Sequence, residues 1–197
     1  MQKYNGLINV SKEAGYTSFD VVAKLRGILQ MRKIGHTGTL DPNATGVLVV
    51  CLGKATKVCD LITDKTKEYI TTFTLGITTD TQDISGNILQ QRFVCVSEAD
   101  IQKVTASYVG KQQQIPPMYS AKKVDGKKLY EYARKGECVE RKPAEIEIFE
   151  IELLQVTSLE VQMRVVCSKG TYIRTLINDI GETLLKSAVL LMQLLSK

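Results

Sequence analysis

The spacing of hydrophobic residues changes along this chain between the alternation of a strand and the three- to four-residue period of a helix. Short apolar or alternating runs predict strands at residues 6–10, 47–52, 69–75, 88–96, 145–154 and 160–166. The run 47–52 contains no polar side chain, which is typical of a strand buried on both faces. We expect 88–96 to return as the hairpin partner of 69–75, after a polar loop at 78–87. The alternation of 145–154 slips near Phe149 and Glu150, which indicates a bulge.

Helical spacing occurs in four segments between these runs. Thr17, with Asp20 three residues later, predicts a capping box and a helix whose apolar face carries Val21, Val22, Leu25, Ile28 and Leu29. Ser97 is expected to cap a second helix carrying Ile101, Val104 and Tyr108, and a short helix is expected at 55–62. A last helix from about Tyr172 is expected to bury one stripe and to end in an apolar group: Ile173, Leu176, Ile177, Ile180 and Leu184, then Leu190, Leu191, Leu194 and Leu195. Strands and helices that are interspersed without strict alternation predict an α+β fold with a mixed sheet.

The composition narrows the class of protein. Of the 197 residues 44% are hydrophobic and 24% are charged, which excludes wholesale disorder. The sequence shows no secretory signal and no apolar run near the ~20 residues of a membrane span. The five cysteines are widely spaced and form no Cys-x-x-Cys pair, and the single histidine adds little for zinc to bind. We therefore expect a cytoplasmic protein with free thiols, no metal and no membrane contact.

Positive charge is concentrated in two segments of the chain. Residues 1–67 carry ten basic and five acidic side chains, and residues 111–142 carry nine and four, whereas the segments that follow each of them are acidic overall. Such clustering favours a polyanionic partner, because Lys and Arg near phosphates release bound counterions. An ordinary mixed surface can show the same pattern, so charge alone does not decide.

The segment 35–46, with the sequence GHTGTLDPNATG, holds three glycines, the only histidine and an Asp-Pro step. One interpretation is a surface turn, since Asp, Pro, Asn and Gly all form turns. Two other loop types are excluded. Gly53-Lys54 is not followed by Ser or Thr, as a phosphate-binding loop requires. The glycines around His36 resemble a KH-domain clamp, but Asp41-Pro42 prevents the helix that should follow.

The string 35–48 resembles the catalytic motif of the TruB family of tRNA pseudouridine synthases. Four further stretches agree with that family in order and spacing: 67–69 (KEY), 76–86 (GITTDTQDISG), 114–136 (QIPPMYSAKKVDGKKLYEYARKG) and 167–174 (CSKGTYIR). The resemblance covers roughly residues 4–184. It implies a pseudouridine-synthase-like, mostly antiparallel mixed sheet flanked by helices. It also implies one catalytic domain over 1–197, with an RNA-clamping insertion at about 111–142 and no C-terminal RNA-binding PUA domain.

The resemblance implies that the protein isomerises uridine to pseudouridine in the T-loop of tRNA (uridine 55), without a cofactor. Asp41 corresponds to the essential carboxylate, acting toward the ribose either as nucleophile or as base. Arg174 corresponds to the arginine that pairs with it, and an arginine fork suits a carboxylate. Tyr69 corresponds to the tyrosine that stacks on the target base and takes part in its late proton transfer.

Other residues are expected to bind the substrate. His36 corresponds to the histidine that fills the gap left by the extruded base, although a histidine satisfied by local turn hydrogen bonds is the alternative. The remaining contacts implied by the resemblance come from Tyr172, Lys12, Tyr119, Lys122, Lys127 and Lys128. Basic side chains interleaved with tyrosines suit RNA backbone and unpaired bases. The expected partner is the T-arm of tRNA, bound by a monomer. The alternative is a shortened, weakly active or non-catalytic tRNA-binding protein of the same fold.

Overall fold

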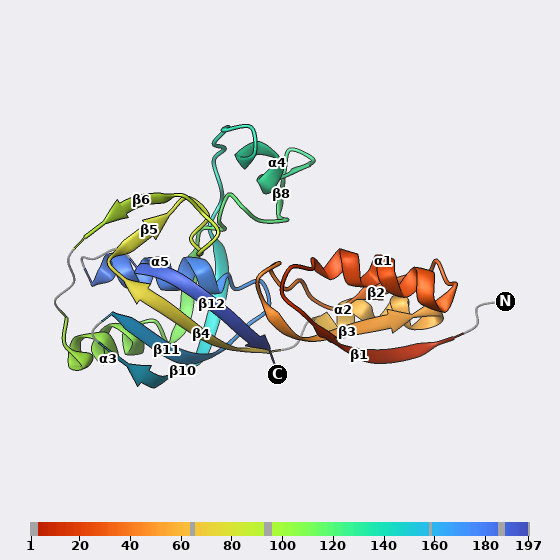
Figure 1. Ribbon diagram of the computed structural model, residues 1–197, viewed down its shortest axis with the longest axis horizontal. Coiled ribbons are helices and arrows are strands. Elements are labelled where there is room, and N and C mark those ends of the chain that lie inside the picture. Colours follow the sequence, from red (N-terminus) through yellow and green to blue (C-terminus); the bar gives the residue numbers. More distant parts are fainter. Residues whose placement is uncertain (1–3, 64–65, 93–95, 158, 185–187, 197) are drawn as a thin grey trace. The chain divides into compact units, whose positions relative to one another are not determined.

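The computed structural model describes residues 4–63, 66–92, 96–157, 159–184 and 188–196 (Figure 1). The chain divides into two compact units, residues 1–70 with 193–197, and residues 71–192. Each unit combines antiparallel strand pairs with helices, so the predicted α+β class is confirmed. Among the described residues, no helix combines the length and the apolar composition that a membrane crossing requires.

The first unit is a small sheet with one long helix. Its elements are β1 (Gly6–Lys12), α1 (Ser18–Leu29), β2 (Ile34–His36), β3 (Thr45–Leu52), the 3-10 helix η1 (Gly53–Val58) and α2 (Cys59–Thr63). Strands β1 and β2 both pair antiparallel with β3. The capping box predicted for α1 is confirmed, because the Thr17 hydroxyl accepts a hydrogen bond from the Asp20 amide and the Asp20 carboxylate accepts one from the Thr17 amide. The short helix expected at 55–62 is present but begins as a 3-10 turn.

The core of this unit lies between α1 and one face of β3. It contains Val21, Val22, Met31, Ile34, Leu48, Val50 and Leu52. Two expectations are wrong here. Ile28 is 67% exposed because it lies on the outer side of α1. The expected burial of both faces of β3 fails at Val47, which is 44% exposed, but holds nearer the end of the strand, where Cys51 on the same face is fully buried.

The second unit contains a sheet with the strand order β4-β11-β10-β7. Its elements are β4 (Lys67–Leu75, which begins in the first unit), β5 (Ile77–Thr79), β6 (Ile88–Gln91), α3 (Glu98–Ser107), β7 (Gly110–Gln114), β8 (Lys123–Val124), β9 (Lys127–Lys128), α4 (Leu129–Ala133), β10 (Ala144–Val156), β11 (Glu160–Cys167), α5 (Ile173–Thr183) and β12 (Ala188–Ser196, which ends in the first unit). The predicted bulge is confirmed, since the β10–β11 register shifts between Ile148 and Glu150. The predicted α5 stripe is buried throughout.

Two expected elements of this unit are wrong. Strand β6 pairs with β5 in a separate two-stranded sheet, not with β4, because Gly76 at φ +92° ends β4 and lets the chain turn away. Residues 93–95 of the expected strand 88–96 lie outside the described residues.

The apolar group Leu190, Leu191, Leu194 and Leu195 does not extend the last helix. Residues 188–196 form β12 instead, where Leu195 and Ser196 pair parallel with Thr45 and Gly46.

Candidate functional site

The loop that carries Asp41 is anchored on both sides of that residue. The Leu40 amide donates to the hydroxyl of Ser18, the first residue of α1, at 3.0 Å. The Pro42 carbonyl accepts a hydrogen bond from the Gly15 amide at 2.9 Å. Asp41 itself is half-buried, and its own carbonyl accepts from the Ala44 amide at 3.0 Å, which closes a tight turn. The turn-forming composition therefore produces a loop whose backbone is anchored on both sides of Asp41.

Lys12 supports the same loop from the end of β1. Its ammonium donates to the carbonyls of Tyr16 at 2.7 Å, Glu13 at 2.9 Å and Pro42 at 3.2 Å, and the side chain is almost fully buried. Burial lowers the pKa of Lys12, and the negative charges of Asp41 and then Asp20 partly oppose this shift. A buried cation thus lies within electrostatic reach of Asp41. The structure brings Lys12 close to Asp41, but the ammonium is bound to three backbone carbonyls, and the expected contact of Lys12 with the substrate stays a prediction.

His36 and Tyr69 are the other predicted site residues of the first unit. His36 ends β2 opposite Val50, and its Nδ1 is buried without a hydrogen-bond partner among the described residues. A buried nitrogen in that state is uncommon in folded proteins. Tyr69 lies half-buried in β4.

In the second unit, Arg174 is buried in the first turn of α5 and is 6% exposed. Its Nη1 lies 3.2 Å from Asp83 Oδ2 and also donates to the Thr81 carbonyl, while Nη2 donates to the Tyr119 carbonyl at 2.9 Å. The planar guanidinium is therefore held from several directions. Asp41 belongs to the first unit and Arg174 to the second, and the expected pairing of Arg174 with Asp41 stays a prediction.

Asp83 is a residue that sequence reasoning did not single out. Its Oδ1 accepts hydrogen bonds from the Thr81 hydroxyl at 2.8 Å and from the amide and hydroxyl of Ser85. Gly86 closes the same turn, where an added Cβ would lie only 2.3 Å from the Thr81 hydroxyl oxygen. Asp83 lies within the motif 76–86, which resembles the family. The turn-forming residues of that motif predict only a polar loop and not a buried carboxylate.

Tyr172 is the N-cap residue of α5, and its side chain makes no cap hydrogen bond. Its backbone is instead bound by Gln114, a second residue missed from the sequence. The Tyr172 amide donates to Gln114 Oε1 at 2.8 Å, and Gln114 Nε2 donates to the Tyr172 carbonyl at 3.0 Å. Tyr172 thus lies two residues before Arg174 at the same helix start.

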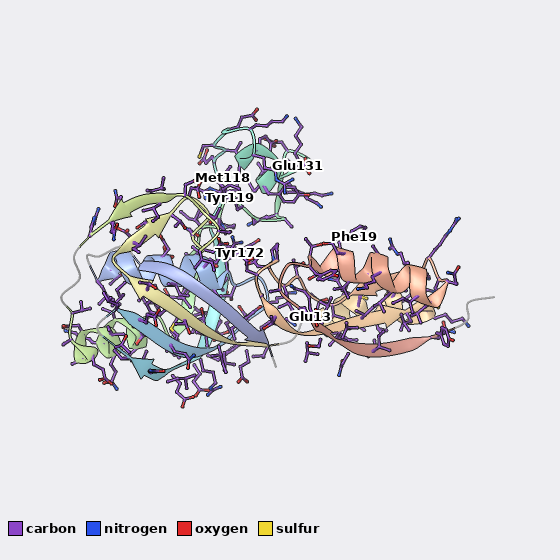
Figure 2. All side chains as sticks on the ribbon, viewed as in Figure 1. Glu13, Phe19, Met118, Tyr119, Glu131 and Tyr172 are labelled. Atoms are coloured by element: carbon purple, nitrogen blue, oxygen red, sulfur yellow. The ribbon has the colours of Figure 1, made fainter. Side chains whose placement is uncertain are left out.

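The basic segment between β7 and β10 forms an arm that projects from the sheet of the second unit (Figure 1). Figure 2 labels Tyr119 at the base of this arm and Tyr172 before α5. Strands β8 and β9 form a hairpin whose turn, Asp125-Gly126, has φ angles of +50° and +81°. Lys122 and Lys127 are exposed, and Lys128 is half-buried with its ammonium 5.4 Å from the centre of the Tyr130 ring. Of the predicted contact residues of the arm, Lys127 and Lys128 lie on the hairpin, and Tyr119 and Lys122 lie before it in the chain.

No group of three or more His, Cys, Asp or Glu side chains that could hold a metal ion occurs within the described part of the chain. The geometry instead offers an anchored carboxylate beside a buried cation in one unit, and a clamped arginine with a basic arm in the other.

Comparison with known proteins identifies these motifs. A family model described as "TruB family pseudouridylate synthase (N terminal domain)" matches residues 26–173. The tRNA pseudouridine synthase B of Lachnoclostridium phytofermentans is 57% identical over 188 residues, covering 91% of this chain and 61% of the relative. That of Alkaliphilus oremlandii is 52% identical over 180 residues, covering 91% of this chain and 60% of the relative. The chain therefore spans about three fifths of the length of these relatives.

Solved structures agree with the sequence comparison. The fold matches a chain of a Cbf5-Nop10-Gar1 complex with a TM-score of 0.75 and 32% identity, over 98% of this chain and 48% of that one. It also matches a chain of an H/ACA RNP bound to a substrate RNA containing 2'-deoxyuridine, with a TM-score of 0.72 and 30% identity, over 98% of this chain and 46% of that one. The family model matches most of this chain, and the matched residues include the anchored Asp41 loop. This chain therefore belongs to the TruB family of pseudouridylate synthases.

Proposed function

We propose that this protein isomerises uridine to pseudouridine in the T-loop of tRNA, at uridine 55. The observation that carries the proposal is that the family match over residues 26–173 contains Asp41 in a loop anchored through Ser18 and Lys12. In the proposed reaction the uracil is detached from its ribose, turned and rejoined through carbon. A positioned carboxylate suits this chemistry, because the sugar carbon develops positive charge when the base leaves.

Asp41 is the proposed catalytic residue. It acts toward the ribose as a nucleophile that forms a covalent intermediate or as a base that removes a proton. Either role requires the carboxylate to keep one position while the base moves. The bonds from Leu40 to Ser18 and from Lys12 to Pro42 supply that rigidity on both sides of Asp41. The nearby ammonium of Lys12 also compensates the negative charge of Asp41.

Arg174, Tyr69 and Tyr172 form the proposed surroundings of the reacting base. Arg174 supplies a fixed cation, since Asp83 and the carbonyls of Thr81 and Tyr119 hold its guanidinium. The rings of Tyr69 and Tyr172 are half-buried, which suits an amphipathic side chain that stacks on a base. Tyr69 is further proposed to take part in the late proton transfer.

RNA binding is assigned to His36 and the arm. An extruded base leaves a gap whose unstacking costs a few kcal/mol, and we propose that the His36 ring occupies part of it. Among the described residues the buried Nδ1 of His36 has no hydrogen-bond partner, so the local turn does not satisfy that nitrogen. Tyr119, Lys122, Lys127 and Lys128 are proposed to contact the T-arm, because ammonium groups beside tyrosine rings, as at Lys127 and Lys128, suit both phosphates and unpaired bases. We further propose a cytoplasmic monomer that needs neither metal nor cofactor.

The test is to incubate the purified chain with an unmodified tRNA transcript and to map pseudouridine chemically at every uridine. Product at the single T-loop position supports the proposal. Filter binding of the same tRNA is measured in parallel. Binding without product would support the alternative of a non-catalytic tRNA-binding protein. Product at another position would overturn the proposed site, and the absence of both binding and product would overturn the proposal as a whole.

A further inference from the structure

The start of α5 is fixed by a side chain from a distant strand. Gln114 is the last residue of β7, is 3% exposed, and lies 58 positions before Tyr172 in the chain. Its side-chain amide faces the backbone of Tyr172 and makes two hydrogen bonds of opposite direction, at 2.8 and 3.0 Å. The Tyr172 N–H donates to the side-chain oxygen, and the side-chain nitrogen donates to the Tyr172 carbonyl.

Gln114 satisfies one backbone group that the start of α5 leaves without an intrahelical partner, the amide of Tyr172. The first amides of a helix lack partners within the helix and are usually capped by a Ser, Thr, Asp or Asn side chain. The residue in that position here is Tyr172, whose side chain makes no cap hydrogen bond. A glutamine side chain carries one acceptor and two donors on a planar group, so it can imitate a peptide unit toward Tyr172. An apolar side chain can do neither, and an ionised carboxylate can only accept.

The position of Arg174 depends on the same helix start. Arg174 is the second residue of α5, and its guanidinium also binds the carbonyl of Tyr119 at 2.9 Å. Gln114 and Tyr119 therefore flank one short stretch, 115–118, and both its ends are bound to the first turn of α5 or its cap. A shift of the Tyr172 backbone would move the base of Arg174 while Asp83 and Tyr119 hold the other end of its side chain.

We propose that Gln114 is a positioning residue for the reaction: it fixes the backbone of Tyr172 and, through the first turn of α5, the side chain of Arg174. The inference rests on the proposed function for its effect on rate, but its structural part stands by itself. A misplacement of about 1 Å in a catalytic group can cost about a hundredfold in rate. Loss of Gln114 should therefore act on the chemical step and leave the exposed RNA-binding lysines of the arm unchanged.

The test compares Gln114→Met with Gln113→Met in the full 197-residue chain. Methionine keeps the length of glutamine and removes both hydrogen bonds, and Gln113 is the exposed neighbour on the same strand, which makes it the matched control. In Gln114→Met we expect faster hydrogen exchange at the Tyr172 amide and a shift of the Arg174 guanidinium signals in the NMR spectrum. We also expect a single-turnover rate on tRNA at least tenfold lower, with the tRNA Kd within about twofold of the parent. Gln113→Met should change none of these.

The readouts separate this inference from the proposed function. Unchanged exchange at Tyr172, or unchanged Arg174 signals, would overturn the positioning role whether or not the chain is active. A normal single-turnover rate despite faster exchange would overturn its importance for the reaction. If the parent chain makes no pseudouridine, the proposed function has failed, and exchange and guanidinium signals alone decide the structural role. Gln114→Leu, which also lacks both hydrogen bonds, is the second variant and should behave as Gln114→Met if the lost bonds are the cause.

Discussion

Arg174 and Asp83 form a buried ion pair in the second unit, with Nη1 of the arginine 3.2 Å from Oδ2 of the aspartate and side-chain exposures of only 7% and 11%. The two residues lie 91 positions apart, and the loop around Asp83 is shaped by hydrogen bonds from Thr81 and Ser85 to the same carboxylate. Because a buried guanidinium without an anion is costly, this pair stabilises both the Asp83 loop and the first turn of α5.

Asp83→Asn should destabilise the protein by about 3–5 kcal/mol, the usual cost of removing one partner of a buried ion pair. The amide keeps the shape of the carboxylate but leaves the Arg174 charge without its anion. Urea unfolding monitored by circular dichroism measures the change. The control is Asp125→Asn, at an exposed turn position with φ +50° that asparagine tolerates, and its stability should match the parent. Equal stability of the two variants would show that the pair contributes nothing.

Lys12→Met should lower the free energy of unfolding by about 2 kcal/mol or more, because the carbonyls of Glu13, Tyr16 and Pro42 lose a charged donor. Lys33→Met, at an exposed position of the same unit, serves as the control. Urea unfolding of both variants at neutral pH makes the comparison. A loss no larger than that of the control would mean that the three hydrogen bonds do not stabilise the Asp41 loop.

The same lysine predicts a dependence of stability on alkaline pH. Burial lowers the pKa of Lys12 in the folded protein below its usual value of 10.5. Between the lowered pKa and 10.5, the unfolded chain binds the proton that the folded chain has released, so rising pH favours folding at this group. The stability of the parent relative to Lys12→Met should therefore increase as pH rises toward 10.5. A difference that stays flat or falls over this range would contradict the lowered pKa.

Asp41→Asn should abolish formation of pseudouridine while the Kd for tRNA stays within about twofold of the parent. The amide preserves the shape of the side chain but can neither attack the ribose nor accept a proton as a carboxylate does. Chemical mapping after single turnover and filter binding give the two quantities. Turnover comparable with the parent would exclude Asp41 as the catalytic residue.

Replacing Lys122, Lys123, Lys127 and Lys128 together by glutamine should weaken tRNA binding and flatten its dependence on salt. Each lost phosphate contact should reduce the slope of log K against log salt concentration by about 0.7–0.9. Lys103→Gln, on the exposed side of α3, is the control and should leave the slope unchanged. A fourfold variant with the parent's slope would remove the arm from the RNA interface.

Cys51 should resist alkylation in the folded protein. It is fully buried, and desolvation together with the neighbouring thiol of Cys59 raises the pKa of Cys51 to about 12, so almost no thiolate forms near pH 8. Cys138 is exposed and is the internal reference. Mass spectrometry after iodoacetamide treatment should find Cys138 labelled in the folded protein and Cys51 labelled only after unfolding. Equal labelling rates in the folded state would contradict the burial of β3.

Several local features follow from short stretches of sequence alone. The capping box at Thr17, the bulge beside Phe149 and the alternation of β11 all occur where the residue pattern predicts them. In each case the decisive interaction joins neighbours in the chain or depends on one repeating period, so distant segments have little influence. The stripe of α5 is predictable for the same reason.

The errors arise where a distant partner decides. Val47 and Ile28 are apolar and fit their elements, but only the arrangement of α1 against β3 determines which side is covered. The composition of residues 188–196 is compatible with a helix or with a strand. In the structure these residues form a strand, and Leu195 pairs with Thr45 of β3. Strand β6 likewise pairs with β5 and not with β4, because Gly76 ends β4 and the chain turns away there.

Some residues of the candidate site can be predicted from the sequence, and others cannot. Sequence motifs alone determined the family and pointed to Asp41, Lys12 and Arg174, because a reacting or charged side chain has to be one of a few residue types in a recognisable order. Only the tertiary structure revealed Asp83 and Gln114, which contact Arg174 and Tyr172 from 91 and 58 positions away. The physical reason is that a buried charge or helix end must find a partner wherever the fold brings one close, and any polar residue of suitable length can serve.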